Sequence, residues 1–293
     1  MVEEFFIYLE TEKRFSQHTI TAYDNDIRSF LTHCDISSIS QLNEISYQHI
    51  RSWIVELVNS NHSKKSINRK LSSLRTFFKW AQKNDIVDSN PCVRIKGLKQ
   101  EKRIPEFIKE EELDTTKMEM VFPENFSGLR DRLMIEVLYQ TGIRLTELIN
   151  LKKNDVSSEN IKVLGKRNKE RYIPITNELY SAIESYLNMK DYLECYSDYL
   201  FLTDKGRKLY PKFVYRKVHH YLSLLTHLKK RSPHILRHTF ATHMLNNGSG
   251  LETLKELLGH SNLSATQIYT HNSFDQISTI YKQAHPRGNK KSE

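Results

Sequence analysis

The stretch "SPHILRHTFATHML", residues 232–245, has the pattern of a helix that is polar at its start and apolar along one side. Ser232 followed by Pro233 is typical of an N-cap and a first helical position. His234 and Arg237 are three residues apart, so they share one face of the first turn. Because free N–H groups at a helix start favour anions, this segment could bind a phosphate. It could equally be a capped helix whose His and Arg pair with surface carboxylates.

The same helix should also have an apolar face that packs in the core and fixes the position of its polar first turn. Leu236, Phe240 and Met244 recur at helical spacing on the other face, so we expect them to be buried. His238 lies beside the polar face, and we expect it to pack or to support its neighbours. Partners for the polar start must come from other parts of the chain.

Two segments before residue 232 offer such partners. In "YQTGIRLTELINL", Arg144 follows a glycine that should end a helix, and Glu147 comes three residues later. A buried Arg–Glu structural pair is the simpler interpretation. In "VLGKRNKER", Lys166 lies at the end of an expected strand, where a solvent-exposed basic turn is the alternative.

A segment after the stretch supplies two more candidates. In "LLGHSNLSATQIYTH", Gly259 should end a helix, which leaves His260 just beyond it. Ser264 with Gln267 three residues later is a capping box, so a short helix should start there and carry Tyr269. The chain has 15 tyrosines, and a tyrosine is more often a packing residue than a nucleophile.

The composition favours a nucleic-acid partner. The chain has 293 residues and a formal net charge of +9, with a pI near 9.2, and such an excess of Lys and Arg suits a polyanion. A merely basic surface is the alternative. The three cysteines are far apart, which argues against a disulfide framework or structural zinc. The acidic start "MVEEFFIYLETEKRF" does not resemble a signal peptide, and no membrane span is expected, so we expect a cytoplasmic protein.

The hydrophobic pattern predicts a mainly α protein with a small β-sheet, an α+β class, in two domains. Residues 1–97 should be helical, 98–105 a charged linker, 106–286 a second domain and 287–293 a basic tail. Two short strands are expected within the second domain, at 160–165 and 171–175.

The last helical segment of the first domain is strongly basic. Ile67, Leu71, Leu74 and Phe78 form its core stripe, and residues 57–84 contain seven basic side chains but no acidic one. Such a run repels itself unless an anion faces it, and DNA phosphates would serve. A solvated basic face is the alternative. The expected DNA contacts are Lys64, Lys65, Arg69, Lys70, Arg75 and Lys79.

The motifs taken together resemble the tyrosine recombinase (phage integrase) family. "TGIRLTEL", "GKRNKER", "HILRHTFATHML" and "LLGHSNLSATQIYTH" match the family's order and spacing, and "NRKLSSLRTFFKWAQKNDIVDSNP" is similar to the end of its helical, SAM-like core-binding domain. The length, the lack of an additional arm-binding domain and the ending "IYKQAHPRG" resemble the bacterial Xer recombinases. The resemblance covers nearly the whole chain.

The resemblance implies strand exchange through a 3′-phosphotyrosyl intermediate, which needs no ATP and no metal. Tyr269 would attack the scissile phosphate. Arg144 and Arg237 would bind its non-bridging oxygens, and Lys166 would protonate the departing 5′-oxygen. The remaining catalytic positions are His234, which would accept the tyrosine proton, and His260, which would hydrogen-bond a phosphate oxygen.

The implied partners are a double-stranded recombination site and a second Xer-type recombinase in a heterotetrameric synapse that resolves chromosome dimers at cell division. A DNA translocase at the division septum would also fit. The apolar stripe of Phe274, Ile277, Tyr281 and Ala284 would dock into a neighbouring protomer, with packing in its own chain as the alternative. A mobile-element integrase or resolvase, a topoisomerase of type IB and a non-catalytic DNA-binding protein remain alternatives.

Overall fold

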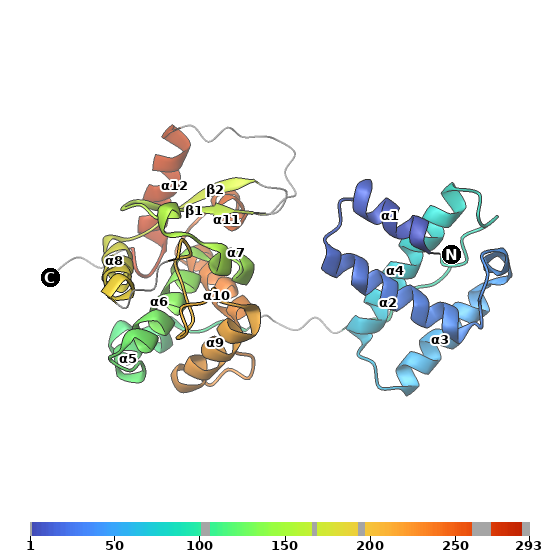
Figure 1. Ribbon diagram of the computed structural model, residues 1–293, viewed down its shortest axis with the longest axis horizontal. Helices are drawn as coiled ribbons and strands as arrows, with labels where there is room; N and C mark the ends of the chain where they lie inside the picture. Colours follow the sequence, from blue (N-terminus) through green and yellow to red (C-terminus); the bar gives the residue numbers. More distant parts are fainter. Residues whose placement is uncertain (1, 101–105, 166–168, 193–196, 260–270, 289–293) are drawn as a thin grey trace. The chain divides into compact units, whose positions relative to one another are not determined.

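The computed structural model describes residues 2–100, 106–165, 169–192, 197–259 and 271–288. The chain forms two compact units, residues 1–104 and 105–293 (Figure 1). The division falls within the segment 98–105 that the sequence predicts as a linker. Within the described ranges, no helix has the length and apolar character needed to cross a bilayer.

The first unit is helical, as the hydrophobic pattern predicts. Its core stripe of Ile67, Leu71, Leu74 and Phe78 is fully buried. The stripe packs with Phe5, Trp53 and other aromatic side chains of the shorter helices. The elements are α1 (Glu3–Thr11), α2 (Gln17–His33), the 3₁₀ helix η1 (Ser40–Glu44), α3 (Tyr47–Asn59) and α4 (Lys64–Lys83).

The second unit combines helices with one small sheet, which confirms the expected mainly α class. The elements before the sheet are η2 (Glu110–Leu113), α5 (Thr115–Val121), α6 (Phe126–Thr141), α7 (Leu145–Asn150) and η3 (Lys153–Asp155). The sheet and the elements after it are β1 (Asn160–Leu164), β2 (Glu170–Pro174), α8 (Asn177–Tyr192), α9 (Pro211–Leu225), α10 (Pro233–Asn246), α11 (Leu251–Leu258) and α12 (His271–Ala284).

Helix α6 forms the centre of the second unit. Every residue from Leu133 to Thr141 is buried, and the helix packs against α8 and α10 (Figure 1). It ends at Gly142, which has φ +59°. A Cβ atom there would lie 2.5 Å from the Phe240 ring, so both the turn and the packing of α10 require glycine.

Among the described residues, the sheet consists of β1 and β2, which pair antiparallel. Its register pairs Asn160 with Pro174 and Leu164 with Glu170. Arg171 and Ile173 of β2 face inward, because successive side chains on a strand alternate between its faces. A buried arginine in a short strand requires a buried acceptor, and α7 supplies it.

Helix α12 packs on its own chain in this single-chain structure. Ile277, Tyr281 and Ala284 are buried and Phe274 is half-buried, and the helix packs on α10 and β2 of its own chain. In the single chain the apolar stripe is therefore covered in cis, whereas the resemblance favoured docking in trans. The cis arrangement removes this stripe from water without a partner.

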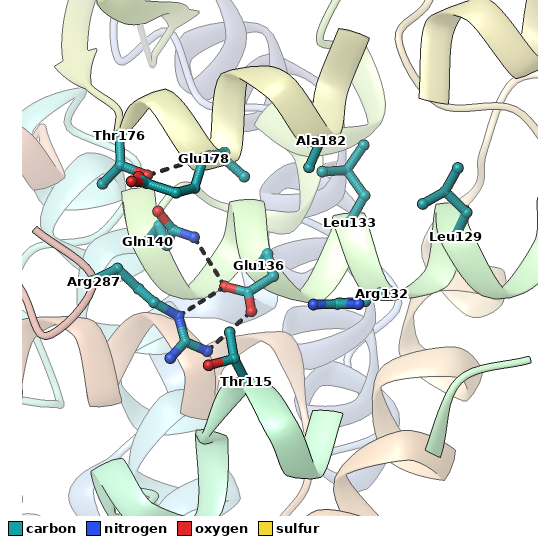
Figure 2. A pocket seen from close by; sticks show the side chains of 11 residues that line it. Thr115, Leu129, Arg132, Leu133, Glu136, Gln140, Thr176, Glu178, Ala182 and Arg287 are labelled. Carbon is teal, nitrogen blue, oxygen red and sulfur yellow. Dashed lines mark hydrogen bonds and ion pairs between the residues drawn. The ribbon is translucent and has the colours of Figure 1, made fainter. Parts of the chain in front are cut away.

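The expected basic tail begins later than residue 287, since Arg287 belongs to the second unit. Its guanidinium forms an ion pair with Glu136 at 3.0 Å and donates to the Leu113 carbonyl at 2.6 Å. Figure 2 shows Arg287 facing Glu136, which also accepts a hydrogen bond from Gln140. These side chains line a pocket of about 220 Å³ between α6 and α8. A carboxylate buried in α6 needs a cation, and the end of the chain provides it.

A buried cluster of histidine and tyrosine side chains joins α6, α10 and the end of α12. The Tyr139 hydroxyl and His243 Nδ1 are 3.0 Å apart. The His285 ring stacks on Tyr281 at 5.2 Å and is fully buried. The core side of α10 therefore carries the polar His243 as well as the apolar Leu236, Phe240 and Met244. Burial lowers the pKa of His285 to about 3 and also lowers the pKa of His243.

We expect the second unit to lose stability as the pH falls below 6.5. His285 stays neutral in the folded state but gains a proton in the unfolded state, so acid favours unfolding. One pKa unit corresponds to ~1.4 kcal/mol, so this residue costs about 2 kcal/mol at pH 5. Urea unfolding between pH 7.5 and pH 5 measures the effect.

The matched variant for this prediction is His285→Asn, whose amide oxygen can replace Nδ1 as the acceptor for the Arg287 N–H. Its free energy of unfolding should be lower than that of the wild type at pH 7.5, yet it should depend less on pH. The exposed His219→Asn serves as the control. Equal pH slopes in His285→Asn and the wild type would contradict the prediction.

Candidate active site

Arg144 is placed by the start of α7. It is the N-cap residue, and its backbone N–H donates to Glu147 Oε2 at 2.7 Å. Its Nη1 donates to Glu147 Oε1 at 2.8 Å, so one carboxylate fixes both ends of the residue. The Arg–Glu spacing in the sequence predicts this pair. The arginine side chain remains 27% exposed, which leaves it accessible to a ligand.

Glu147 has a second arginine partner that the sequence does not reveal. Arg171 of β2 donates from Nη1 to Oε1 at 3.0 Å and from Nη2 to Oε2 at 2.8 Å. Burial by itself would raise the pKa of Glu147, but the hydrogen bonds and charges of Arg171 and Arg144 lower it to about 2. The carboxylate is therefore ionised at neutral pH. The feature of the sequence that could have indicated this pair is an arginine at an inward position of a short strand.

Arg237 reaches from α10 to the ends of two other helices. Its Nη1 donates to the Gly142 carbonyl after α6, and its Nη2 donates to the Leu258 carbonyl at the end of α11 at 2.7 Å. Arg144 donates from Nη2 to the next carbonyl, that of Gly259, at 3.1 Å. The structure thus brings Arg144 and Arg237, 93 positions apart in the sequence, to one helix terminus.

The site is electropositive. Burial first, and then the charge of Arg144, lower the pKa of Arg237 to about 10, which leaves it protonated at neutral pH. Arg144, Arg171 and Arg237 share the single carboxylate of Glu147 as a charged partner among the described residues. An anion placed against Arg144 and Arg237 would reduce their repulsion, and a phosphate matches the guanidinium geometry.

The other predicted catalytic residues are placed less fully. His234 lies in the first turn of α10 with an exposed side chain. Lys166, His260 and Tyr269 lie outside the described residues. Two of their described neighbours lie at the site. Gly259 ends α11 beside Arg144, and a Cβ atom at Gly165 would lie 3.5 Å from Arg171 Nη1. Leu236, Phe240 and Met244 are fully buried, as predicted.

Helix α4 of the first unit carries the predicted DNA-binding residues, and some of them pair with an acidic residue of another helix. The buried Asp26 of α2 forms ion pairs with Arg69 and Lys70 and accepts a hydrogen bond from Ser73 at 2.8 Å. The basic run therefore does face an acidic residue, which is distant in the sequence. Arg75 donates to the Ile95 carbonyl at 2.6 Å.

The basic residues of α4 still gather on one side. At 100° per residue, Lys64, Arg75, Lys79, Lys65 and Arg69 occupy an arc of about 140°. Lys70 lies on the opposite, buried side, where it neutralises Asp26 and its side chain is 13% exposed. The prediction that Lys70 contacts DNA is therefore not retained, because its ammonium group pairs with Asp26 inside the unit.

The two units match two family models. Residues 2–84 match "Phage integrase, N-terminal SAM-like domain", and residues 98–276 match "Phage integrase family". "Tyrosine recombinase XerC" of Staphylococcus aureus (strain MRSA252) is 37% identical over 294 residues, covering 99% of this chain and 98% of that protein.

Solved structures agree on the fold. The XerH site-specific recombinase in a post-cleavage complex has a TM-score of 0.72 at 21% identity, covering 98% of this chain and 81% of XerH. A λ integrase fragment (residues 75–356) has a TM-score of 0.68 at 16% identity, covering 92% of this chain and 98% of the fragment. With both family models and the full-length relative in agreement, the chain belongs to the phage integrase family of tyrosine recombinases, enzymes that cut and rejoin DNA, and within it to the Xer subgroup.

Proposed function

We propose that this chain exchanges DNA strands through a tyrosyl–DNA intermediate at the site around Arg144 and Arg237. The observation that carries the proposal is the convergence of these two arginines on consecutive carbonyls at the end of α11. The chain continues from this point through His260 to Tyr269. A phosphate bound by the arginines would therefore lie near the start of the segment that carries the nucleophile.

In the cleavage step, the Tyr269 oxygen attacks the scissile phosphorus and the bond to the 5′-oxygen breaks. A 3′-phosphotyrosyl bond replaces it, which conserves the bond energy. Lys166 gives a proton to the departing 5′-oxygen, and His234 accepts the proton of the tyrosine hydroxyl. Attack by a 5′-hydroxyl of the second duplex reverses these steps and joins the exchanged strands.

The arginines act on the charge of the transition state. Arg144 and Arg237 contact the two non-bridging oxygens, which carry extra negative charge when five oxygens surround phosphorus. Both guanidinium groups are held by carbonyls and a carboxylate before DNA arrives, so little reorganisation is needed. His260 donates a further hydrogen bond to a phosphate oxygen.

The exposed side of α4 provides a second DNA-binding surface, which lies in the first unit. We propose that Lys64, Lys65 and Lys79 contact phosphates, because their side chains are exposed, with Arg69 and Arg75 as partly engaged neighbours. Each phosphate contact releases counterions, so affinity should fall steeply with salt.

The triple variant Lys64→Ala, Lys65→Ala, Lys79→Ala should lower the slope of log K against log salt concentration by about 2 to 3, at ~0.9 per contact. Fluorescence anisotropy with a labelled duplex at several salt concentrations measures it. Lys13→Ala is the control, because Lys13 is an exposed lysine two residues beyond the end of α1. An unchanged slope in the triple variant would remove α4 from the interface.

The biological role that we propose is the resolution of chromosome dimers in the cytoplasm, with a second Xer-type recombinase completing a heterotetrameric synapse. The support is the 37% identity to XerC along nearly the whole chain. The ending "IYKQAHPRG" also resembles XerC more than XerD. A DNA translocase at the division septum stays a prediction.

The test is covalent trapping on a library of nicked duplexes drawn from the host genome, with and without the candidate partner. A nick beside the cleavage position releases the 5′-hydroxyl strand and traps the protein on DNA. A denaturing gel isolates the adduct, and sequencing identifies the site.

Three outcomes separate the hypotheses. Enrichment of one chromosomal site supports dimer resolution. Enrichment of the ends of a mobile element retains the chemistry but contradicts the proposed role. DNA binding without any adduct, even with the partner present, contradicts the chemistry and favours a non-catalytic DNA-binding protein.

A further inference from the structure

Arg171 connects three parts of the active site. It is 4% exposed and lies in β2, five residues after Lys166 in the sequence. Both of its terminal nitrogens bind Glu147, and its Nε donates to the Leu257 carbonyl at 2.8 Å. One side chain thus joins the hairpin, α7 and the end of α11.

The three arginines bind three consecutive carbonyls. Arg171 binds Leu257, Arg237 binds Leu258 and Arg144 binds Gly259. The last carbonyls of a helix lack intrahelical donors and carry partial negative charge, so cations suit them. The consecutive carbonyls at the end of α11 therefore set the spacing between the three arginine side chains.

Arg171 also packs against the turn at Gly259. Gly259 has φ +63°, and a Cβ atom there would lie 3.2 Å from Arg171 Nη1. On the hairpin side, a Cβ atom at Gly165 would lie 3.5 Å from the same nitrogen. Arg171 therefore packs between the residues that precede Lys166 and His260.

We propose that Arg171 is a positioning residue of the reaction, which holds Glu147 so that Arg144 faces the scissile phosphate. The inference rests on the proposed function and adds a residue to it. Glu147 accepts four hydrogen bonds, two from Arg144 and two from Arg171. Without Arg171, half of these donors are lost, and a buried carboxylate with fewer donors rotates to find others.

The test compares Arg171→Lys with the wild type in single-turnover cleavage of a nicked duplex. Lysine retains the charge but cannot bind both carboxylate oxygens and a carbonyl at once. We expect cleavage to slow on the order of 10²-fold, as for a small displacement of a catalytic group. The Kd for the same duplex should change less than about threefold, because binding rests on many phosphates.

The matched control is Arg130→Lys. Arg130 is also fully buried, pairs with Asp131 and Asp204 and donates to the Leu202 carbonyl, but it does not contact Glu147 or α11. Its replacement should lower the free energy of unfolding while leaving the cleavage rate of the folded protein within about threefold. Equal slowing in both variants would mean that Arg171 acts only through stability.

A double-mutant cycle then asks whether Arg171 acts through Arg144. In an Arg144→Lys background, Arg171→Lys should slow cleavage less than about threefold further, because coupled residues are not additive. If the slowing in the double variant equalled the product of the two single-variant effects, the proposal would be overturned.

A crystal structure of Arg171→Lys gives a readout that does not depend on activity. We expect the Arg144 guanidinium to separate from the Gly259 carbonyl. An unmoved Arg144 would overturn the positioning role. If the wild type itself formed no adduct, the proposed recombination chemistry would be wrong. The position of Arg144 in the crystal structure of Arg171→Lys would still show whether Arg171 positions it.

Discussion

Tyr269→Phe is expected to abolish the covalent protein–DNA adduct while leaving DNA affinity almost unchanged. Phenylalanine lacks the oxygen that forms the phosphotyrosyl bond, so no other step can proceed. The aromatic ring itself is retained, so the change removes only the hydroxyl group. Among the predicted effects this is the largest, because it removes a reactant rather than a stabilising contact.

The measurement is the nicked-duplex assay followed by a denaturing gel, with affinity measured separately by anisotropy. Tyr215→Phe is the control, since Tyr215 is an exposed tyrosine of the same unit. It should form the adduct at the wild-type rate. An adduct that persists in Tyr269→Phe would identify a different nucleophile.

Arg237→Ala is expected to slow cleavage by ~10²- to 10³-fold, the range seen when one donor to a developing oxyanion is removed. Arg237→Lys should fall between alanine and the wild type, because lysine supplies charge without the bidentate geometry. DNA affinity should decrease only slightly in either variant.

Stability must be separated from chemistry in this comparison. Alanine leaves the Gly142 and Leu258 carbonyls without their donor, which should cost about 1–3 kcal/mol of folding free energy. Rates are therefore compared per folded molecule, after urea titration. Arg132→Ala, which removes a partly exposed ion pair with Glu119, should retain the wild-type rate. A wild-type rate in Arg237→Ala would exclude it from the site.

The sequence could predict features that depend on neighbouring residues. Gly142 and Gly259 end their helices with positive φ because only glycine adopts that conformation freely. Pro233 starts α10, and the 3.6-residue period of α4 marks its buried side. The Arg144–Glu147 pair also follows from local spacing, because residues three apart meet on a helix.

The tertiary structure decided which partner each buried charge and polar group has. Asp26 forms an ion pair with the basic side of α4. Arg171 donates hydrogen bonds to Glu147, and Arg287 forms an ion pair with Glu136. Each of these pairs joins residues that are far apart in the sequence, so no periodicity reveals it. Burial makes an unpaired charge costly, and the fold alone determines which opposite charge lies close enough to compensate it.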